Sequence, residues 1–380
     1  MLLLLATCVA FRLPVTPQSG AESSTPQATE VHVQNPGWWP TKGTAPRRAY
    51  AGPAACAECH AEKATAQNTT PMAHASMLGA DSEILQSHER LTFRSGPYSY
   101  QIIRSQNVSN YSVTDGERTI SSSLSWAFGF DEVGQTYMIE RNGKFYESRL
   151  SYYKSLDGLD FSPGHPHAIP RTLESAFGRP VYASEMPLCF GCHTTASTTS
   201  NKFDLGQAFH GVTCEACHGP GAEHVAAMKK GAIPAGLKLI FNPRKLTPIE
   251  SADFCGACHR TPWDVALAGS TGIFNIRFQP YRLESSRCWG KGDARITCVA
   301  CHDPHQPLNH DLASYDERCL QCHAATAGSK ATTEHPGAAC PVDTRNCASC
   351  HMPKYEIPGM HSKFTDHRIR VVKNEKSFPD

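Results

Sequence analysis

Seven short segments of this chain share one arrangement of thiol and imidazole side chains. In each, two residues separate a pair of cysteines, and a histidine directly follows the second cysteine. With 17 Cys and 19 His among 380 residues, about 0.04 copies are expected by chance. The cysteines and histidines of the seven segments are Cys56, Cys59 and His60; Cys189, Cys192 and His193; Cys214, Cys217 and His218; Cys255, Cys258 and His259; Cys298, Cys301 and His302; Cys319, Cys322 and His323; and Cys347, Cys350 and His351.

This spacing is typical of covalent haem c attachment. Two thiols three positions apart on a helical turn lie on one face, where they add to the two haem vinyl groups. The histidine then supplies a nitrogen ligand to the iron. Zinc ribbons also pair cysteines but do not require the following histidine, and a thioredoxin-like motif would occur once, beside a βαβ pattern. The sequence therefore predicts seven covalently bound haem c groups, with the motif histidines as proximal ligands.

Three cysteines lie outside the motifs, namely Cys8, Cys288 and Cys340. Cys288 and Cys340 both flank haem motifs, so a disulfide between them would suit an oxidising compartment. Spacing alone does not fix connectivity, and two buried free thiols are the alternative.

The first 20 residues resemble a secretory signal peptide. The run from Met1 to Phe11 is apolar but too short to span a bilayer, and small residues at Ser19 and Ala21 offer a cleavage site. The segment ending Ala6-Thr7-Cys8 also resembles a bacterial lipobox, which would place a lipid anchor at Cys8. We expect export to the periplasm, cell surface or extracellular space of a bacterium.

The composition suits a chain whose core is partly porphyrin. Lys and Arg total 36 against 35 Asp and Glu, a net charge of +1 that gives no long-range attraction to nucleic acid. We therefore predict no nucleic-acid partner. Hydrophobic residues make up 40% and aromatic residues 9%, which is lean for this length. Covalently held haems would replace side chains in the core.

Composition and motif spacing divide the chain into segments. Residues 21–48 are rich in Pro, Ser, Thr and Gln, which predicts a flexible linker. A helix after the first motif should run through Glu62 and Lys63 until Pro71 breaks it. A second helix is expected from Ala222 to Lys230, before Gly231. The segments are a 1–20 leader, a 21–48 linker, a 49–84 first haem segment, an 85–155 β-rich subdomain, a 156–187 Pro- and Gly-rich loop, a 188–370 six-haem domain and a 371–380 tail.

The fold class is predicted as mainly α and irregular, with short helices around stacked haems and a small antiparallel β subdomain. Asp115-Gly116 and Asn142-Gly143 each suit a two-residue hairpin turn between residues of strand character. Six motifs fall within the 163 residues from Cys189 to His351 (351 − 189 + 1). At that density porphyrin edges must approach one another, as electron hopping requires.

Twelve histidines lie outside the motifs, more than the seven distal ligands that seven irons can use. The segment from Gly211 to His224 resembles one shared by the tetrahaem cytochromes of nitrifying bacteria and the hydroxylamine oxidoreductases. Residues 50–370 are also similar to multihaem cytochromes of acidobacterial-type genomes. The matching segments are Tyr281-Arg282-Leu283, Ser286-Arg287-Cys288, Cys301-His302-Asp303-Pro304-His305, Cys350-His351-Met352-Pro353-Lys354 and Phe364-Thr365-Asp366-His367-Arg368-Ile369.

The resemblance implies distal ligands. It gives His224 the role of ligating the iron of a different haem, implies the same kind of role for His305 and His367, and favours His88 and His361. The distal ligands of the remaining haems are expected among four further histidines, His74, His165, His210 and His335. Met72 is an alternative distal ligand to His74. We predict His32 and His310 as non-ligands.

Bis-His haems favour an electron carrier that works between redox protein partners or a quinol-linked donor. Two alternatives stay open. One is catalysis on hydroxylamine, nitrite or nitric oxide at a five-coordinate haem. The sequence lacks the Cys-x-x-Cys-Lys motif that multihaem nitrite reductases have at the active haem. Hydroxylamine oxidoreductases cross-link a tyrosine to the catalytic haem, but nothing in the spacing selects one of Tyr152, Tyr153, Tyr182 and Tyr281 for that role. The other is self-assembly into an extracellular filament through a distal histidine donated between subunits.

Overall fold

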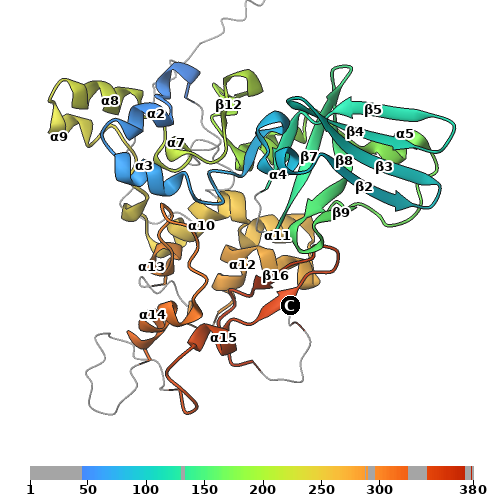
Figure 1. Ribbon diagram of the computed structural model, residues 1–380. Coiled ribbons are helices and arrows are strands. Elements are labelled where there is room, and N and C mark those ends of the chain that lie inside the picture. Colours follow the sequence, from blue (N-terminus) through green and yellow to red (C-terminus); the bar gives the residue numbers. More distant parts are fainter. Residues whose placement is uncertain are drawn as a thin grey trace, which may run out of the picture.

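The computed structural model has a β-rich part and a helical part, which lie side by side (Figure 1). Predictions for the leader, most of the linker, Cys8, His32 and His335 lie outside the described residues. Among the residues that are described, no helix is both long and apolar enough to cross a bilayer. The described residues are 45–129, 133–286, 288–289, 296–323, 340–372 and 378.

Two antiparallel sheets form the β-rich part, called here the β unit, residues 76–181. One sheet has the order β1-β6-β7-β8-β10 with β9 also on β8, and the other has the order β2-β3-β4-β5. The strands are β1 Ser76–Leu78, β2 Arg90–Ser95, β3 Tyr98–Ser105, β4 Val108–Thr114, β5 Thr119–Ser123, β6 Trp126–Phe128, β7 Gly134–Arg141, β8 Lys144–Tyr153, β9 Gly158–Phe161 and β10 Gly178–Val181.

Alternation of side chains builds the core of the β unit. Every second residue is buried in β4 and in the first five residues of β3, and both strands contribute fully buried tyrosines, Tyr100 and Tyr111. Helix α5 (Leu173–Phe177) packs against both sheets and adds Phe177 to the same cluster. The β unit therefore has a hydrophobic core of its own, separate from the haem motifs.

The second predicted hairpin turn is confirmed. Arg141 pairs with Lys144, and the two residues between them have positive φ angles of 53° and 68°, as a type I′ turn requires. The first hairpin also forms, but its two-residue turn was wrong: Thr114 pairs with Thr119, leaving a four-residue loop. The Asp115 side chain causes this, because its Oδ1 accepts from the backbone N–H groups of residues 117 and 118.

Replacing Gly143 by alanine should lower the free energy of unfolding by about 1–2 kcal/mol, because a Cβ is strained in the left-handed region. A Cβ at this position would meet no atom within 4 Å, so the whole cost is conformational. Gly158→Ala is the matched control, since Gly158 also lies in the β unit but lacks a positive φ. Denaturant unfolding would measure both; equal destabilisation by the two changes would contradict the prediction.

The predicted loop over 156–187 is wrong in part. It contains β9, α5 and β10, and both strands pair with β8, so the β unit extends beyond the predicted 85–155 in both directions. Short strands that carry glycine and proline look like loop in a sequence. Pro180 is tolerated because β10 is an edge strand, where a missing N–H costs little.

The helical part consists of short helices and small two-stranded ribbons. Thr247 and Thr261 each form a capping box with an acid three residues later, followed by a proline at the first helical position, which explains where α10 and α11 begin. The helices outside the β unit are α2 Pro53–Ala57, α3 Ala61–Gln67, α6 Met186–His193, α7 Cys214–His218, α8 Ala222–Lys229, α9 Ile233–Gly236, α10 Pro248–His259, α11 Pro262–Ala268, α12 Gln279–Glu284, α13 Cys298–Cys301, α14 Asp316–Leu320 and α15 Cys347–His351.

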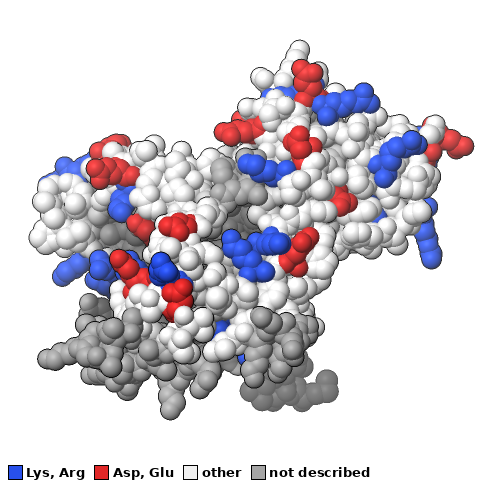
Figure 2. Space-filling model, turned by 60° about the horizontal axis from the view of Figure 1, so that its bottom comes forward, with Lys and Arg blue, Asp and Glu red and all other residues white. Residues whose placement is uncertain are grey.

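Two sequence-predicted helices are confirmed. Helix α3 ends at Gln67, four residues before Pro71, and α8 ends beside Gly231, which has a φ of 74°. Helix α4 (Glu83–Ser87) joins β1 to β2, and the ribbons are β11 Thr194–Thr195 with β14 Phe209–His210, β12 Thr198–Thr199 with β13 Lys202–Phe203, and β15 Lys354–Glu356 with β16 Lys363–Thr365. On the face shown in Figure 2, Lys and Arg are interspersed with Asp and Glu.

Candidate haem sites

Helical turns carry the haem-attachment motifs, here numbered 1 to 7 in chain order. Helices α7 and α15 coincide with motifs 3 and 7, while α6 and α10 end at the histidines of motifs 2 and 4. Motif 1 begins on α2, motif 5 lies on α13 and motif 6 begins on α14. A helical turn puts the two sulfurs of a motif on one face, which is the arrangement that two thioether bonds to one porphyrin need.

Backbone carbonyls fix the orientation of several motif histidines. The Nδ1 atoms of His193, His218 and His351 each donate to a backbone oxygen at 2.9 Å. A carbonyl only accepts, so Nδ1 carries the proton and Nε2 presents its lone pair. Ligating histidines in metalloproteins are held in this way by their other ring nitrogen. His259 has a related contact, from Nδ1 to Gln279 Oε1 at 3.2 Å.

Burial favours the neutral imidazole, which is the form that ligates iron. It lowers the pKa of four motif histidines, His193, His218, His259 and His302. The distal candidate His367 shows the largest effect: burial lowers its pKa to about 4, against a smaller opposing contribution from its hydrogen bond to the Thr365 carbonyl.

Two distal candidates face motif histidines. The imidazole centroid of His305 lies 5.9 Å from that of His218 of motif 3. The centroid of His367 lies 6.2 Å from that of His302 of motif 5. A third candidate, His224 on α8, has its Nδ1 at the Gly236 carbonyl at 2.8 Å, in the manner of the motif histidines.

Three other distal candidates contact acids of the β unit. His88 Nε2 lies 3.1 Å from Asp157 Oδ1, and His361 Nε2 lies 2.7 Å from Asp160 Oδ2. The side chain of His165 is buried, and its Nε2 lies 3.4 Å from Glu147 Oε2. Of the two further candidates, His74 has its Nε2 at the Asn68 carbonyl at 2.8 Å, and His210 packs beside Trp126. In this arrangement the Nε2 atoms of His88, His361 and His74 are engaged by oxygen.

Cysteines of different motifs contact one another at the N-terminal end of the haem part. Cys56 of motif 1 shares a hydrogen bond with Cys214 of motif 3, which together with burial raises the pKa of the Cys56 thiol. Cys192 of motif 2 donates to the Ala257 carbonyl, inside motif 4, at 3.6 Å. In the haem-loaded protein these sulfurs are thioethers that no longer titrate, so the contacts identify neighbouring attachment positions.

Motif 4 also lies near motifs 3 and 5. A hydrogen bond to Cys298 of motif 5, followed by burial, raises the pKa of Cys255 of motif 4, and Cys217 of motif 3 adds to this shift. Motif 4 therefore has three neighbours among the motifs: 2, 3 and 5.

The proximity of cysteines from different motifs continues to motif 7. Burial, followed by Cys301 of motif 5, raises the pKa of Cys319 of motif 6, and a hydrogen bond links Cys319 to Cys347 of motif 7. The motifs are thus neighbours in the order 1-3-4-5-6-7, with motif 2 beside motif 4. In Figure 1 the corresponding helices descend from α2 and α7 through α10 and α13 to α14 and α15.

The disulfide considered between Cys288 and Cys340 is absent from the structure, in which Cys340 is a free thiol; the alternative of two buried thiols does not hold either, because Cys288 is exposed. Cys288 instead lies near Cys319 of motif 6, where it contributes to the raised pKa of that thiol.

Sequence analysis gave no role to two buried carboxylates. Glu215, inside motif 3, is 1% exposed and accepts three backbone hydrogen bonds. Asp366, directly before His367, is fully buried in a bidentate pair with Arg282. Both lie within segments that carry the family resemblance. The signal available in the sequence was an acidic residue directly beside a candidate ligand or an attachment cysteine.

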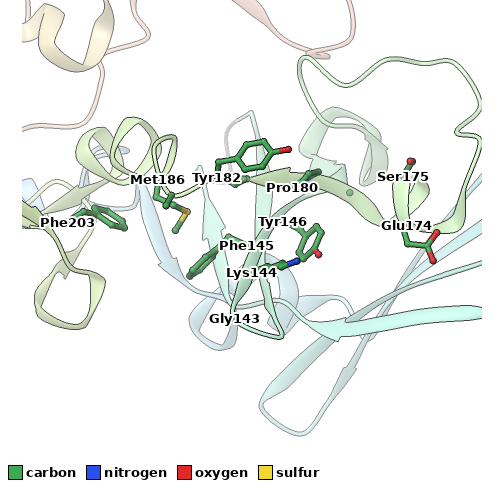
Figure 3. A pocket seen from close by; sticks show the side chains of 13 residues that line it. Gly143, Lys144, Phe145, Tyr146, Glu174, Ser175, Pro180, Tyr182, Met186 and Phe203 are labelled. Atoms are coloured by element: carbon green, nitrogen blue, oxygen red, sulfur yellow. The ribbon is translucent and has the colours of Figure 1, made fainter.

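The tyrosines considered for a haem cross-link lie in different surroundings. Tyr152 and Tyr153 are buried in β8, and their hydroxyls donate to Asp157 and to the Phe161 carbonyl. Tyr182 is 66% exposed and lines a cleft with Phe145, Met186 and Phe203 (Figure 3). The cleft lies at the start of α6, one turn before Cys189, and no motif residue lines it.

The family model described as cytochrome c554 and c-prime matches residues 171–219, which contain motifs 2 and 3. The multihaem cytochrome MtrA of Shewanella baltica (strain OS185) is 27% identical over 211 residues, covering 43% of this chain and 61% of MtrA. The chain therefore spans less than two thirds of this curated relative. The chain is a multihaem c-type cytochrome. A solved structure, that of the outer cell wall cytochrome OcwA, has a TM-score of 0.49 at 16% identity over 85% of this chain and 80% of that chain.

The residues of this cytochrome fit covalently bound haem c. Each motif supplies two thiols and one imidazole, and the structure adds carbonyl anchors that fix the rings of His193, His218 and His351. When bound, haem c supplies an iron that exchanges single electrons. In the haem-loaded protein the cysteines would hold the porphyrin, and the carbonyl contacts would orient the imidazole ligands.

Proposed function

We propose that the chain is an exported heptahaem c-type cytochrome that relays electrons between redox partners. One observation carries this proposal: the unbroken order of neighbouring attachment cysteines from motif 1 to motif 7. A haem protein that performs chemistry at one iron needs no such continuity. A carrier does need it, because an electron that enters at one end must find a next acceptor at each step.

Two histidine pairs support bis-His ligation. Imidazoles that bind one metal from opposite sides at roughly 2.0–2.1 Å per bond have ring centroids about 6 Å apart. The His218–His305 separation of 5.9 Å and the His302–His367 separation of 6.2 Å match this value. We assign the first pair to haem 3 and the second to haem 5. An iron with two protein ligands has no position for a substrate, which favours electron transfer.

The site of action is proposed from the sequence. The apolar leader and the need to attach haem c outside the cytoplasm favour the periplasm or the cell surface. The partners would be redox proteins or a quinol-linked donor that meet the relay near its ends, at motifs 1 and 7, or at motif 2.

Removing haem 4 should divide the relay, because motif 4 is the neighbour of motifs 2, 3 and 5. The variant replaces Cys255 and Cys258 by serine. A photoreductant attached to a surface cysteine introduced beside motif 7 injects one electron, and transient visible spectra follow its redistribution. In the variant, the haems beyond the gap should fill much more slowly than in the unaltered cytochrome.

The matched control removes the branch. Serines at Cys189 and Cys192 delete haem 2, an equal loss of cofactor that leaves the order 1-3-4-5-6-7 intact. Rapid redistribution should survive in this variant. The relay proposal fails if the two deletions slow redistribution equally, or if mass spectrometry of the unaltered protein finds fewer than seven haems.

A further inference from the structure

Glu215 occupies an unusual position for a charged residue. It directly follows the first cysteine of motif 3, and only 1% of it is exposed to solvent. A carboxylate is buried at high cost unless hydrogen bonds stabilise its charge. Its Oε1 accepts from Ala51 N at 2.8 Å and from Gly221 N at 2.7 Å, and its Oε2 accepts from Gly52 N at 2.8 Å. Three N–H donors therefore surround the buried carboxylate group.

The three donors come from both sides of an interface between haem motifs. Ala51 and Gly52 precede α2, which carries Cys56 of motif 1, while Gly221 follows motif 3. All three are uncharged backbone N–H groups, so they hold the carboxylate without adding an opposite unit charge. Glu215 therefore joins motif 1 to motif 3 and leaves a net negative charge between them.

The field of this charge reaches both attachment positions. A hydrogen bond with Cys214 and burial are the main causes that raise the pKa of Cys56, and the Glu215 carboxylate raises it further. The hydrogen bond with Cys56 lowers the pKa of Cys214, and Glu215 acts in the opposite direction. Burial, followed by Glu215, raises the pKa of Tyr50. A negative potential at these positions favours the more positive, oxidised state of an iron held there.

We propose that Glu215 is a fixed negative charge that holds the midpoint potentials of haems 1 and 3 below the values these haems would otherwise have. Because electrons move from low to high potential, haems 1 and 3 would then be the end of the relay from which electrons pass to the other haems. The inference rests on the proposed function only in that motifs 1 and 3 must carry haem; it does not depend on the rate or direction of transfer.

Glu215→Gln tests the charge, because glutamine keeps the length of the side chain and an acceptor oxygen. Spectroelectrochemical titration of the purified holoprotein should show that part of the haem absorbance, corresponding to two haems, moves to higher potential. Glu58→Gln is the matched control. Glu58 lies inside motif 1, but it is exposed and pairs with Lys229 at 2.8 Å, so its titration curve should superimpose on that of the unaltered protein.

A second variant covers the outcome in which Glu215→Gln does not mature. Ala51→Pro removes one N–H donor and keeps the carboxylate, and the extended backbone of Tyr50 (φ −93°, ψ 127°) tolerates a following proline. With less compensation of the charge, the same two haems should move to lower potential. Haem content from mass spectrometry shows separately whether motifs 1 and 3 are loaded. Unchanged curves in loaded variants, or shifts of the same sign in both, would overturn the inference.

Discussion

Replacing Arg282 by methionine should lower the free energy of unfolding by about 3 kcal/mol, among the largest single effects that a side chain of this protein can have. The guanidinium donates to both oxygens of Asp366, at 2.9 and 3.0 Å, and the two side chains are 1% and 0% exposed. Loss of one partner leaves a buried carboxylate undercompensated. We expect the lower end of the range for such pairs, because Arg370 also contacts Asp366. Guanidinium unfolding followed by far-UV circular dichroism would measure the change.

An exposed ion pair provides the control for this prediction. Arg345 lies 3.7 Å from Asp343, with side chains 81% and 54% exposed, so Arg345→Met should change stability by no more than about 0.5 kcal/mol. Similar losses in the two variants would mean that burial of the Arg282–Asp366 pair contributes nothing particular. Asp366 directly precedes His367, the proposed distal ligand of haem 5. The Arg282 variant should therefore also alter the visible spectrum of one haem.

Replacing His305 by alanine should create one binding site for carbon monoxide in the fully reduced protein. In the proposed ligation, His305 is the second protein ligand of haem 3, opposite His218. Removing it would leave the iron with one protein ligand and a position for carbon monoxide, whereas the unaltered protein should bind little carbon monoxide. His305 is partly exposed, with a side chain 33% accessible, so the fold should tolerate the change. The measurement is the Soret difference spectrum, with an expected amplitude of one haem in seven.

His310→Ala is the control, because the sequence predicts that His310 is not a ligand. Its reduced spectrum should not respond to carbon monoxide beyond that of the unaltered protein. An unaltered protein that already binds carbon monoxide at one haem would revive the catalytic alternative. In that case hydroxylamine, nitrite and nitric oxide would be the next compounds to add.

The local features of the fold were the most predictable from sequence. Asn142-Gly143 specified its turn because only residues that tolerate positive φ fit there, and the motif spacing specified helical turns for the same kind of local reason. Where prediction failed, pairing partners distant in sequence decided the structure. Nothing near β10 in the sequence indicates that it pairs with the end of β8 that follows the turn.

The candidate sites likewise combine residues that local spacing identifies with contacts between residues distant in sequence. Motif residues could be identified from spacing alone, but the neighbours of each motif could not, because Cys56 meets Cys214 across 158 residues (214 − 56). The histidine pairs are equally non-local. Glu215 was visible in the sequence as an acid inside a motif, yet its burial depends on Ala51 and Gly52, which approach only in the folded chain.

The chain segments on the two sides of the β unit meet, one directly before β1 and the other at the end of α6. The Ala75 carbonyl, directly before β1, accepts from His193 Nδ1, which lies 118 residues later. Once the β unit and α6 have folded and this hydrogen bond has formed, the chain between Cys56 and Cys214 behaves as a loop of about 40 residues rather than 158, which lowers the entropic cost of closing it by about 1 kcal/mol. A folded segment whose flanking residues meet adds little to the entropic cost of closing the loop that contains it, whatever its length. The haem-bearing part of the chain is therefore free to accept longer, shorter or different inserts between its first two motifs without changing its own course.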